Sequence, residues 1–205
     1  MGVKKLILSV VLLIAVPSVH ADSKDHQLEF AFGLEFGKAY SEAEIDEMDK
    51  VECQQFKDEV DEVIACKIHK PPKPYYEFER YGVMLLGEQR ILTGVFAGKN
   101  FGEWQSEDYE TSRIPCSGLQ KRVTSNIEKN RGINLKWKRT DLPDFNNAVV
   151  REVTEQWSAP NLAGTHKQLI SVTCKGKNTT GWQLTVLYHL EEIPEEQRPK
   201  DTSGL

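Results

Sequence analysis

The chain has 205 residues, with 26 Lys and Arg against 31 Asp and Glu, which gives a formal net charge of −5 at pH 7. Its 8 Phe, 6 Tyr and 4 Trp exclude a disordered protein, because enough large apolar side chains are present to build a core. The negative charge, together with the export predicted below, argues against nucleic acid as a partner. A single long apolar run excludes a polytopic membrane protein.

The N-terminus has the three parts of a secretory signal peptide. Lys4 and Lys5 give a positive start, the apolar run Leu6–Val16 follows, and Val19 and Ala21 supply the residues that signal peptidase recognises. The run is shorter than the roughly 20 residues that a transmembrane helix needs. We therefore predict cleavage after Ala21, a location in the periplasm or the medium, and no transmembrane anchor in the mature chain. An uncleaved anchor is the alternative.

The first mature segment predicts a strand followed by a short helix. Leu28–Gly33 alternates large apolar residues with small or polar ones, as in a strand that ends at a glycine. Ser41 and Glu44 then form the pattern of a capping box, in which each side chain satisfies a free backbone amide of the other residue. We expect the helix to continue to about Glu52.

Three strands are predicted next. Ile64–His69 alternates apolar and polar residues, and Pro71–Pro74 ends this strand because proline cannot donate to a β-ladder. Tyr81–Leu86 and Ile91–Ala97 flank the turn residues Gly87–Arg90 and predict a β-hairpin.

A long polar loop and a second helix separate these strands from the next group. Gly98–Arg113 is polar and is predicted to be a loop. Pro115 is expected to open the helix, since its fixed φ suits a first helical turn, and Gly132 is expected to end it. The apolar stripe of this helix consists of Leu119, Val123 and Ile127.

Four further strands complete the chain. The clearest is Trp182–Leu190, because its large apolar residues recur at every second position. Beyond residue 193 the chain is charged and poor in apolar residues, and we predict a flexible tail over 194–205. The other three predicted strands are Ile133–Lys138, Val149–Trp157 and Gln168–Cys174.

We predict from this order an α+β fold, a mainly antiparallel sheet of about eight strands covered by two helices. We expect residues 22–193 to form a single domain, and its possible halves, 27–98 and 112–193, share a predicted helix-then-strands order. That order leaves a distant pseudo-repeat open as a hypothesis.

The mature chain contains four cysteines, an even set that predicts disulfides in an exported protein. Four cysteines allow three pairings, and the sequence alone does not choose among them. We favour Cys53–Cys66 and Cys116–Cys174, because each pair then falls within one half of the chain. Buried free thiols are the alternative. No Cys-x-x-Cys pair is present, so no metal site is expected.

Charge is distributed unevenly along the chain and suggests a binding surface. The segment Glu42–Glu62 holds 10 acidic and 2 basic residues, whereas Lys121–Arg139 holds 7 basic residues and 1 acidic one. Such asymmetry can steer an anionic partner, for example an acidic envelope protein. The alternative is that the two segments neutralise each other. The candidate basic binding residues are Lys121, Arg122, Lys136, Lys138 and Arg139.

A second candidate contact is the segment Pro71–Tyr76. Its prolines stiffen the backbone, and Tyr75 and Tyr76 offer a large contact area at a low entropy cost. The alternative is a connector whose tyrosines pack on the core.

No catalytic motif is visible: the sequence has no G-x-S-x-G, no H-E-x-x-H and no phosphate-binding glycine loop. We therefore favour an exported, non-catalytic binding protein of the cell envelope, with an inhibitor, immunity-type or assembly role and no cofactor. The alternative is a small periplasmic hydrolase or transferase that uses a histidine and an acid. The mature histidines are His26, His69, His166 and His189.

Overall fold

The computed structural model describes residues 27–57, 62–102, 109–143, 149–161, 164–177 and 181–192. The predicted signal peptide, His26 and the predicted tail lie outside these residues. Among the described helices, none is long and apolar enough to cross a membrane. The elements are β1 (Phe30–Ala31), β2 (Leu34–Glu35), α1 (Glu42–Asp46), β3 (Lys50–Lys57), β4 (Glu62–Ile68), β5 (Arg80–Leu86), β6 (Ile91–Asn100), α2 (Tyr109–Arg131), β7 (Lys136–Pro143), β8 (Val149–Pro160), β9 (His166–Lys177) and β10 (Gly181–Glu192).

The described strands form one large sheet with the order β3-β4-β5-β6-β10-β9-β8-β7, and β1 and β2 form a separate small pair. All pairs in both sheets are antiparallel, so the prediction of a mainly antiparallel α+β fold is confirmed. Each helix is followed by four strands, and the two groups meet where β6 pairs with β10. The internal pseudo-repeat stays a prediction.

The first half differs from the expectation in its first strand, at the end of its first helix and in a strand that follows this helix. Only Phe30–Ala31 of the predicted strand Leu28–Gly33 forms a strand, β1, and the chain then turns tightly into β2, because Phe32 and Gly33 both adopt positive φ angles, 51° and 82°. The first helix ends at Asp46, not near Glu52, and the chain turns at Asp49, where φ is 54°. The strand β3 that follows was not predicted. It is an edge strand, and its residues 51–56 are all exposed. Since neither face of this strand is buried, its sequence lacks the regular alternation of apolar and polar residues that predicts a strand.

The second half differs mainly at the start of α2. The predicted loop Gly98–Arg113 is wrong at both ends, since β6 continues to Asn100 and α2 begins at Tyr109. Pro115 therefore lies inside the helix and does not open it. The predicted end is confirmed, because α2 stops at Arg131 and the next residue, Gly132, has a φ of 65°. Residues 133–135 precede the strand that starts at Lys136.

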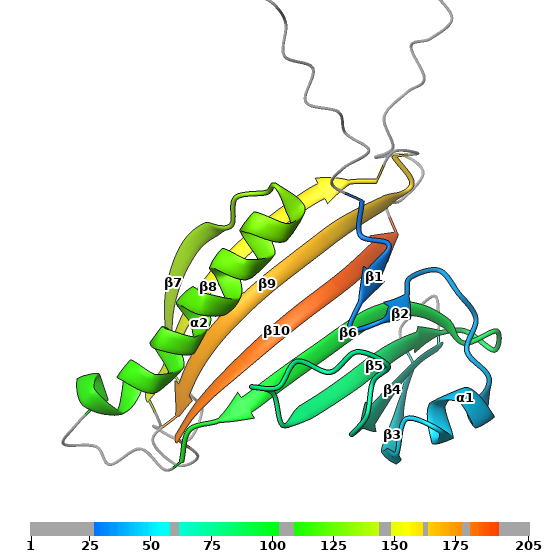
Figure 1. The fold of residues 1–205 in the computed structure, drawn as a ribbon, viewed down its shortest axis with the longest axis horizontal. Coiled ribbons are helices and arrows are strands. Elements are labelled where there is room, and N and C mark those ends of the chain that lie inside the picture. The colour runs from blue at the N-terminus through cyan, green and yellow to red at the C-terminus, as the bar shows by residue number, and fades with distance from the viewer. Residues whose placement is uncertain are drawn as a thin grey trace, which may run out of the picture.

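Two helices cover one side of the large sheet, and each covers only part of it. Figure 1 shows α2 lying along β9, and α1 beside β3 and β4 at the other end of the sheet. The helix α2 contacts β9 and β10. The middle of this side is covered by the segment around Phe32 and by residues 71–78. The Phe32 ring contacts the rings of Phe78, Tyr81 and Tyr188, with centroids 6.0, 5.3 and 5.8 Å apart. The buried apolar side chains form one contiguous cluster that includes residues from both halves.

A disulfide and a buried glutamine fix α2 on the sheet. The predicted disulfides are both present, and Cys116–Cys174 joins α2 to β9. One turn further along the helix, the Gln120 side-chain amide donates to the backbone carbonyls of Val153 and Val172, at 2.8 and 2.9 Å. Because Gln120 is buried, these hydrogen bonds supply the partners that its amide would otherwise lack. The helix face that lines the candidate site below is therefore fixed in position.

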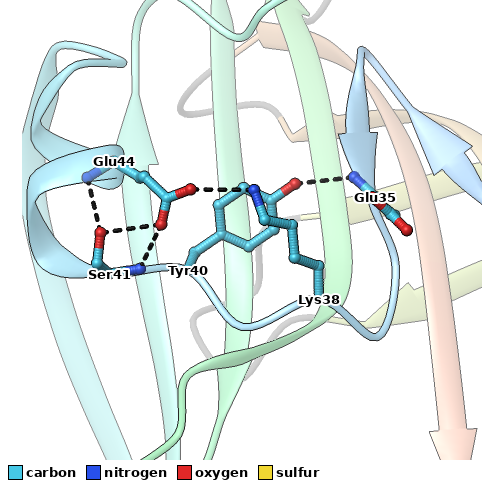
Figure 2. A network of polar contacts seen from close by, with 5 residues as sticks. All are labelled: Glu35, Lys38, Tyr40, Ser41 and Glu44. Atoms are coloured by element: carbon cyan, nitrogen blue, oxygen red, sulfur yellow. Dashed lines mark hydrogen bonds and ion pairs between the residues drawn. The ribbon is translucent and has the colours of Figure 1, made fainter.

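The short helix α1 is held by the capping box that the sequence predicts. The Ser41 N–H and hydroxyl donate to Glu44 Oε2, at 2.8 and 2.9 Å, and the Glu44 N–H donates to Ser41 Oγ at 3.3 Å (Figure 2). Lys38 adds a hydrogen bond to Glu44 Oε1 at 3.0 Å, and the Tyr40 hydroxyl accepts from the Glu35 N–H at 2.9 Å. The network connects α1 to the strand β2.

This network makes stability depend on pH. Hydrogen bonds from the Ser41 backbone, from Lys38 and from the Ser41 hydroxyl lower the pKa of Glu44 from 4.5 to about 2. A carboxyl group whose pKa is lower in the folded state stabilises the fold above its unfolded pKa, and this stabilisation is lost as the pH falls through the folded pKa. We expect the melting temperature to fall between about pH 4.5 and pH 2, and less steeply in Glu44→Gln. Thermal unfolding followed by circular dichroism measures the difference.

The control for this prediction is Glu47→Gln. Glu47 is the exposed residue that caps the C-terminus of the same helix, and its side chain has no hydrogen bond or ion pair to any residue that the structure describes. Its replacement should leave the slope unchanged. Equal slopes for wild type and Glu44→Gln would show that the capping box does not cause the acid sensitivity.

Candidate functional site

The segment Pro71–Phe78 crosses the covered side of the sheet and lies against α2. The Tyr81 hydroxyl accepts from the Tyr75 N–H at 2.9 Å and donates to the Tyr75 carbonyl at 2.8 Å, so one buried side chain binds both backbone groups of Tyr75. The Lys73 N–H donates to the Phe32 carbonyl at 2.9 Å. These hydrogen bonds hold the segment in one conformation against the core.

The two tyrosines of this segment have different environments. Tyr75 is half-buried, and its ring centroid lies 5.2 Å from that of Phe78. Desolvation, with a contribution from the carboxylate of Glu77, raises the pKa of Tyr75. Tyr76 is 84% exposed, the largest exposed fraction among the exposed large apolar side chains that the structure describes. Tyr75 therefore packs on the core, whereas Tyr76 projects from a backbone that is itself fixed.

Polar contacts join the segment to one flank of α2. Arg122 Nη2 lies 2.9 Å from Glu77 Oε1 in an ion pair, and the Asn126 amide donates to the Tyr75 hydroxyl at 3.5 Å. Arg122, Asn126 and Asn130 follow one another at four-residue spacing, which places them on the same side of the helix. Two of the residues predicted to bind, Arg122 and Tyr75, thus meet at this flank.

A cavity of about 270 Å³ opens between α2 and the segment. Its apolar wall includes Phe32, Phe78 and Tyr188, and its polar rim includes Asn126 and Arg131. Burial raises the pKa of the Tyr188 phenol to about 12, so this group stays neutral at physiological pH. The Arg131 guanidinium lies 5.5 Å from the Tyr188 ring centroid and donates to the Phe30 carbonyl at 2.6 Å. No Asp or Glu is among the described residues that line the cavity.

The structure divides the predicted basic surface between the two sides of the sheet. Lys121, Arg122 and Lys129 are all exposed on α2. Lys136 of β7 pairs with Gln156 of β8. The next residue of β8, Trp157, pairs with Ile170 of β9, which is buried on the side of the sheet that α2 covers. Because strand residues alternate between faces, Lys136 lies on the side away from α2. For the remaining two residues only the backbone register is described, with Lys138 opposite Thr154 and Arg139 opposite Val153.

Five acidic residues of the segment Glu42–Glu62 form ion pairs with bases other than the predicted ones. Asp46 lies 2.5 Å from Lys50, and Asp49 lies 2.7 Å from Lys70. The remaining ion pairs of this segment among the described residues are Glu42–Lys50, Glu42–Arg90, Glu44–Lys38 and Glu52–Lys67. None of these bases belongs to Lys121–Arg139, so the acidic and basic segments do not neutralise each other within the described part of the chain.

The histidines of the catalytic alternative lie on different elements. His69 follows β4, His166 begins β9, and His189 lies in β10. The His189 Nδ1 lies 3.1 Å from the Thr93 carbonyl, and burial lowers the pKa of this imidazole. The described residues contain no cluster of three or more His, Cys, Asp or Glu that could hold a metal ion. The hydrolase or transferase role stays a prediction.

Several residues of the candidate site were not predicted from the sequence. Glu77, Asn126 and Arg131 contribute its polar contacts, yet none belongs to a recognisable motif. Only the four-residue spacing of Arg122, Asn126 and Asn130 could have indicated a polar flank on this helix. Compared with known proteins, the chain matches no family model, no curated protein and no solved structure.

Proposed function

We propose that this chain is an exported binding protein that takes an acidic protein partner on one surface, the α2 face. The α2 face consists of Tyr75, Tyr76, Lys121, Arg122, Asn126 and Lys129. The observation that carries the proposal is the exposure of Tyr76, directly after Tyr75, whose backbone is held by Tyr81. Two disulfides support export, because disulfides persist in oxidising compartments.

The α2 face combines the two features that protein interfaces use. A rigid, exposed tyrosine supplies contact area without much loss of side-chain entropy on binding, and tyrosines are enriched among the residues that dominate binding energies. Lys121 and Lys129 have no ion-pair partner among the described residues, so their charges remain available to attract an acidic surface. The neighbouring cavity of about 270 Å³ can accept a side chain of the partner.

The substitution Tyr76→Ala tests the anchoring role. We expect it to lower the affinity for the partner by about tenfold or more, as loss of a central aromatic anchor does. Because Tyr76 is exposed and its ring contact is with the half-buried Tyr75, the melting temperature should stay close to that of wild type. The measurement is capture of a protein from the envelope fraction on the immobilised mature chain, followed by titration of the purified partner.

The matched control is Lys167→Ala, an exposed residue of β9 outside the α2 face. It should retain the same partner with the affinity of wild type. Retention of one acidic protein near equal stoichiometry, released by salt and weakened only by Tyr76→Ala, is the expected result. Retention of background proteins alone, or equal retention by both variants and wild type, would overturn the proposal.

A further inference from the structure

The side of the sheet opposite α2 holds a second cavity, of about 330 Å³, which the proposed function does not use. It lies over β4, β5, β6 and β10, and we refer to it as the open-face cavity. Its lining includes Val51, Phe96, Arg80, Lys67 and Thr185. The volume falls within the range of small-ligand sites, about 300–1,000 Å³.

Glycines on β5 and β6 create this space. Gly82 pairs with Phe96, and a Cβ placed at Gly82 would lie only 2.0 Å from Cζ of the Phe96 ring. The ring therefore lies over the glycine and forms an apolar surface along the sheet. Gly98 pairs with Arg80 and with Thr185, so the position between these two side chains carries no side chain of its own. The floor of the cavity at this point is the backbone of β6.

The charges around the cavity are positive. No Asp or Glu occurs among its described lining residues, whereas the cations Arg80 and Lys67 do. Lys67 forms an ion pair with Glu52, which offsets its charge. Arg80 has a neutral partner instead, because its Nη2 donates to Asn100 Oδ1 at 2.7 Å. No carboxylate lies within ion-pair distance of the Arg80 guanidinium among the described residues.

Hydrogen-bonding groups lie next to Arg80. The Gln183 amide donates to the Thr185 hydroxyl at 3.2 Å, which leaves that hydroxyl able to donate its own proton. An arginine fork offers a carboxylate a planar, two-point contact, and a nearby hydroxyl can donate a further hydrogen bond to it. The Phe96 ring and Val51 then offer an apolar wall for the rest of the ligand.

We propose that the open-face cavity binds a small amphipathic carboxylate, with its carboxylate on Arg80 and Thr185 and its apolar chain along Phe96. Liquid water occupies about 30 Å³ per molecule, so the cavity accommodates a body of roughly ten non-hydrogen atoms. A medium-chain fatty acid has this size and charge. This site is separate from the α2 face, and the failure of one proposal leaves the other standing.

Decanoate is the probe, and decyltrimethylammonium is its counterpart with the opposite charge. The experiment records amide chemical shifts of the isotope-labelled, oxidised chain while each compound is added below its micelle concentration. We expect saturable shifts with decanoate at residues of β4, β5, β6 and β10 around Arg80, Gly98 and Thr185. The cationic compound should produce none at these positions at the same concentration.

Variants connect the binding to Arg80. Arg80→Gln should raise the dissociation constant for decanoate about tenfold or more, and Arg80→Lys, which keeps the charge but loses the fork, should raise it less. Lys99→Gln is the control, because Lys99 lies on β6 next to Gly98 but on the side of the sheet that faces α2. It should leave the constant within about twofold of wild type.

Three results would overturn the proposal. The first is equal binding of decanoate and decyltrimethylammonium, since the site would then not select a charge. The second is an unchanged dissociation constant in an Arg80→Gln variant whose spectrum shows the native fold. The third is a set of shifts confined to the cavity beside α2.

Discussion

Replacing Cys116 and Cys174 together by alanine is expected to lower the free energy of unfolding by about 4 kcal/mol, because this disulfide closes a loop of 58 residues. Both cysteines are fully buried, so the loss also removes packing contacts between α2 and β9. The α2 face depends on this attachment. Urea denaturation of the oxidised wild type and of the double variant gives the difference.

The comparison for this prediction is the corresponding change at Cys53 and Cys66. That disulfide joins neighbouring residues of β3 and β4 at the edge of the sheet and closes a loop with a sequence separation of 13, so its removal should cost less, about 3 kcal/mol. It should also leave α2 in place. A loss below about 1 kcal/mol for the Cys116–Cys174 pair would contradict its role in fixing the helix.

Reversing the charges of Lys121 and Lys129 by Lys121→Glu and Lys129→Glu is expected to slow association with the acidic partner about tenfold or more at low salt. Both side chains are exposed, so their attraction acts mainly on the encounter of the two proteins and weakens as salt screens it. Surface plasmon resonance at two salt concentrations measures the effect. The difference between wild type and variant should shrink as the salt concentration rises.

Lys136→Glu is the matched control for the single variant Lys129→Glu. Both lysines are exposed and have no ion-pair partner among the described residues, but Lys136 lies on the opposite side of the sheet. Its reversal should leave the association rate close to that of wild type. A larger effect from Lys136 than from Lys129 would assign the partner to the other side of the sheet.

The parts of the fold that the sequence predicted depend on local patterns. Trp182, Leu184 and Val186 alternate with polar residues, and the structure buries all three on one face of β10. Ser41 and Glu44 form the predicted capping box. In both cases the residues that carry the signal are close together in the sequence, so no knowledge of the tertiary structure was needed.

The parts that the sequence did not predict depend on contacts between distant segments. β3 is an exposed edge strand, and it is recognisable only by its pairing with β4. The candidate site needs Tyr81 to bind the backbone of Tyr75, and Arg122 to reach Glu77 across 45 residues of sequence. In the sequence, Lys121–Arg139 is one continuous basic stretch. The sequence does not show that Lys136 lies on the opposite side of the sheet from Arg122.

Amide hydrogen exchange of the chain with and without its captured partner tests the central claim most directly. The account predicts that binding slows exchange in residues 71–78 and in the exposed turns of α2 between Lys121 and Lys129, and leaves β7, β8 and β9 unchanged. Slowed exchange in β7 to β9 alone, or no change in α2 and residues 71–78, would contradict the assignment of the α2 face as the binding surface.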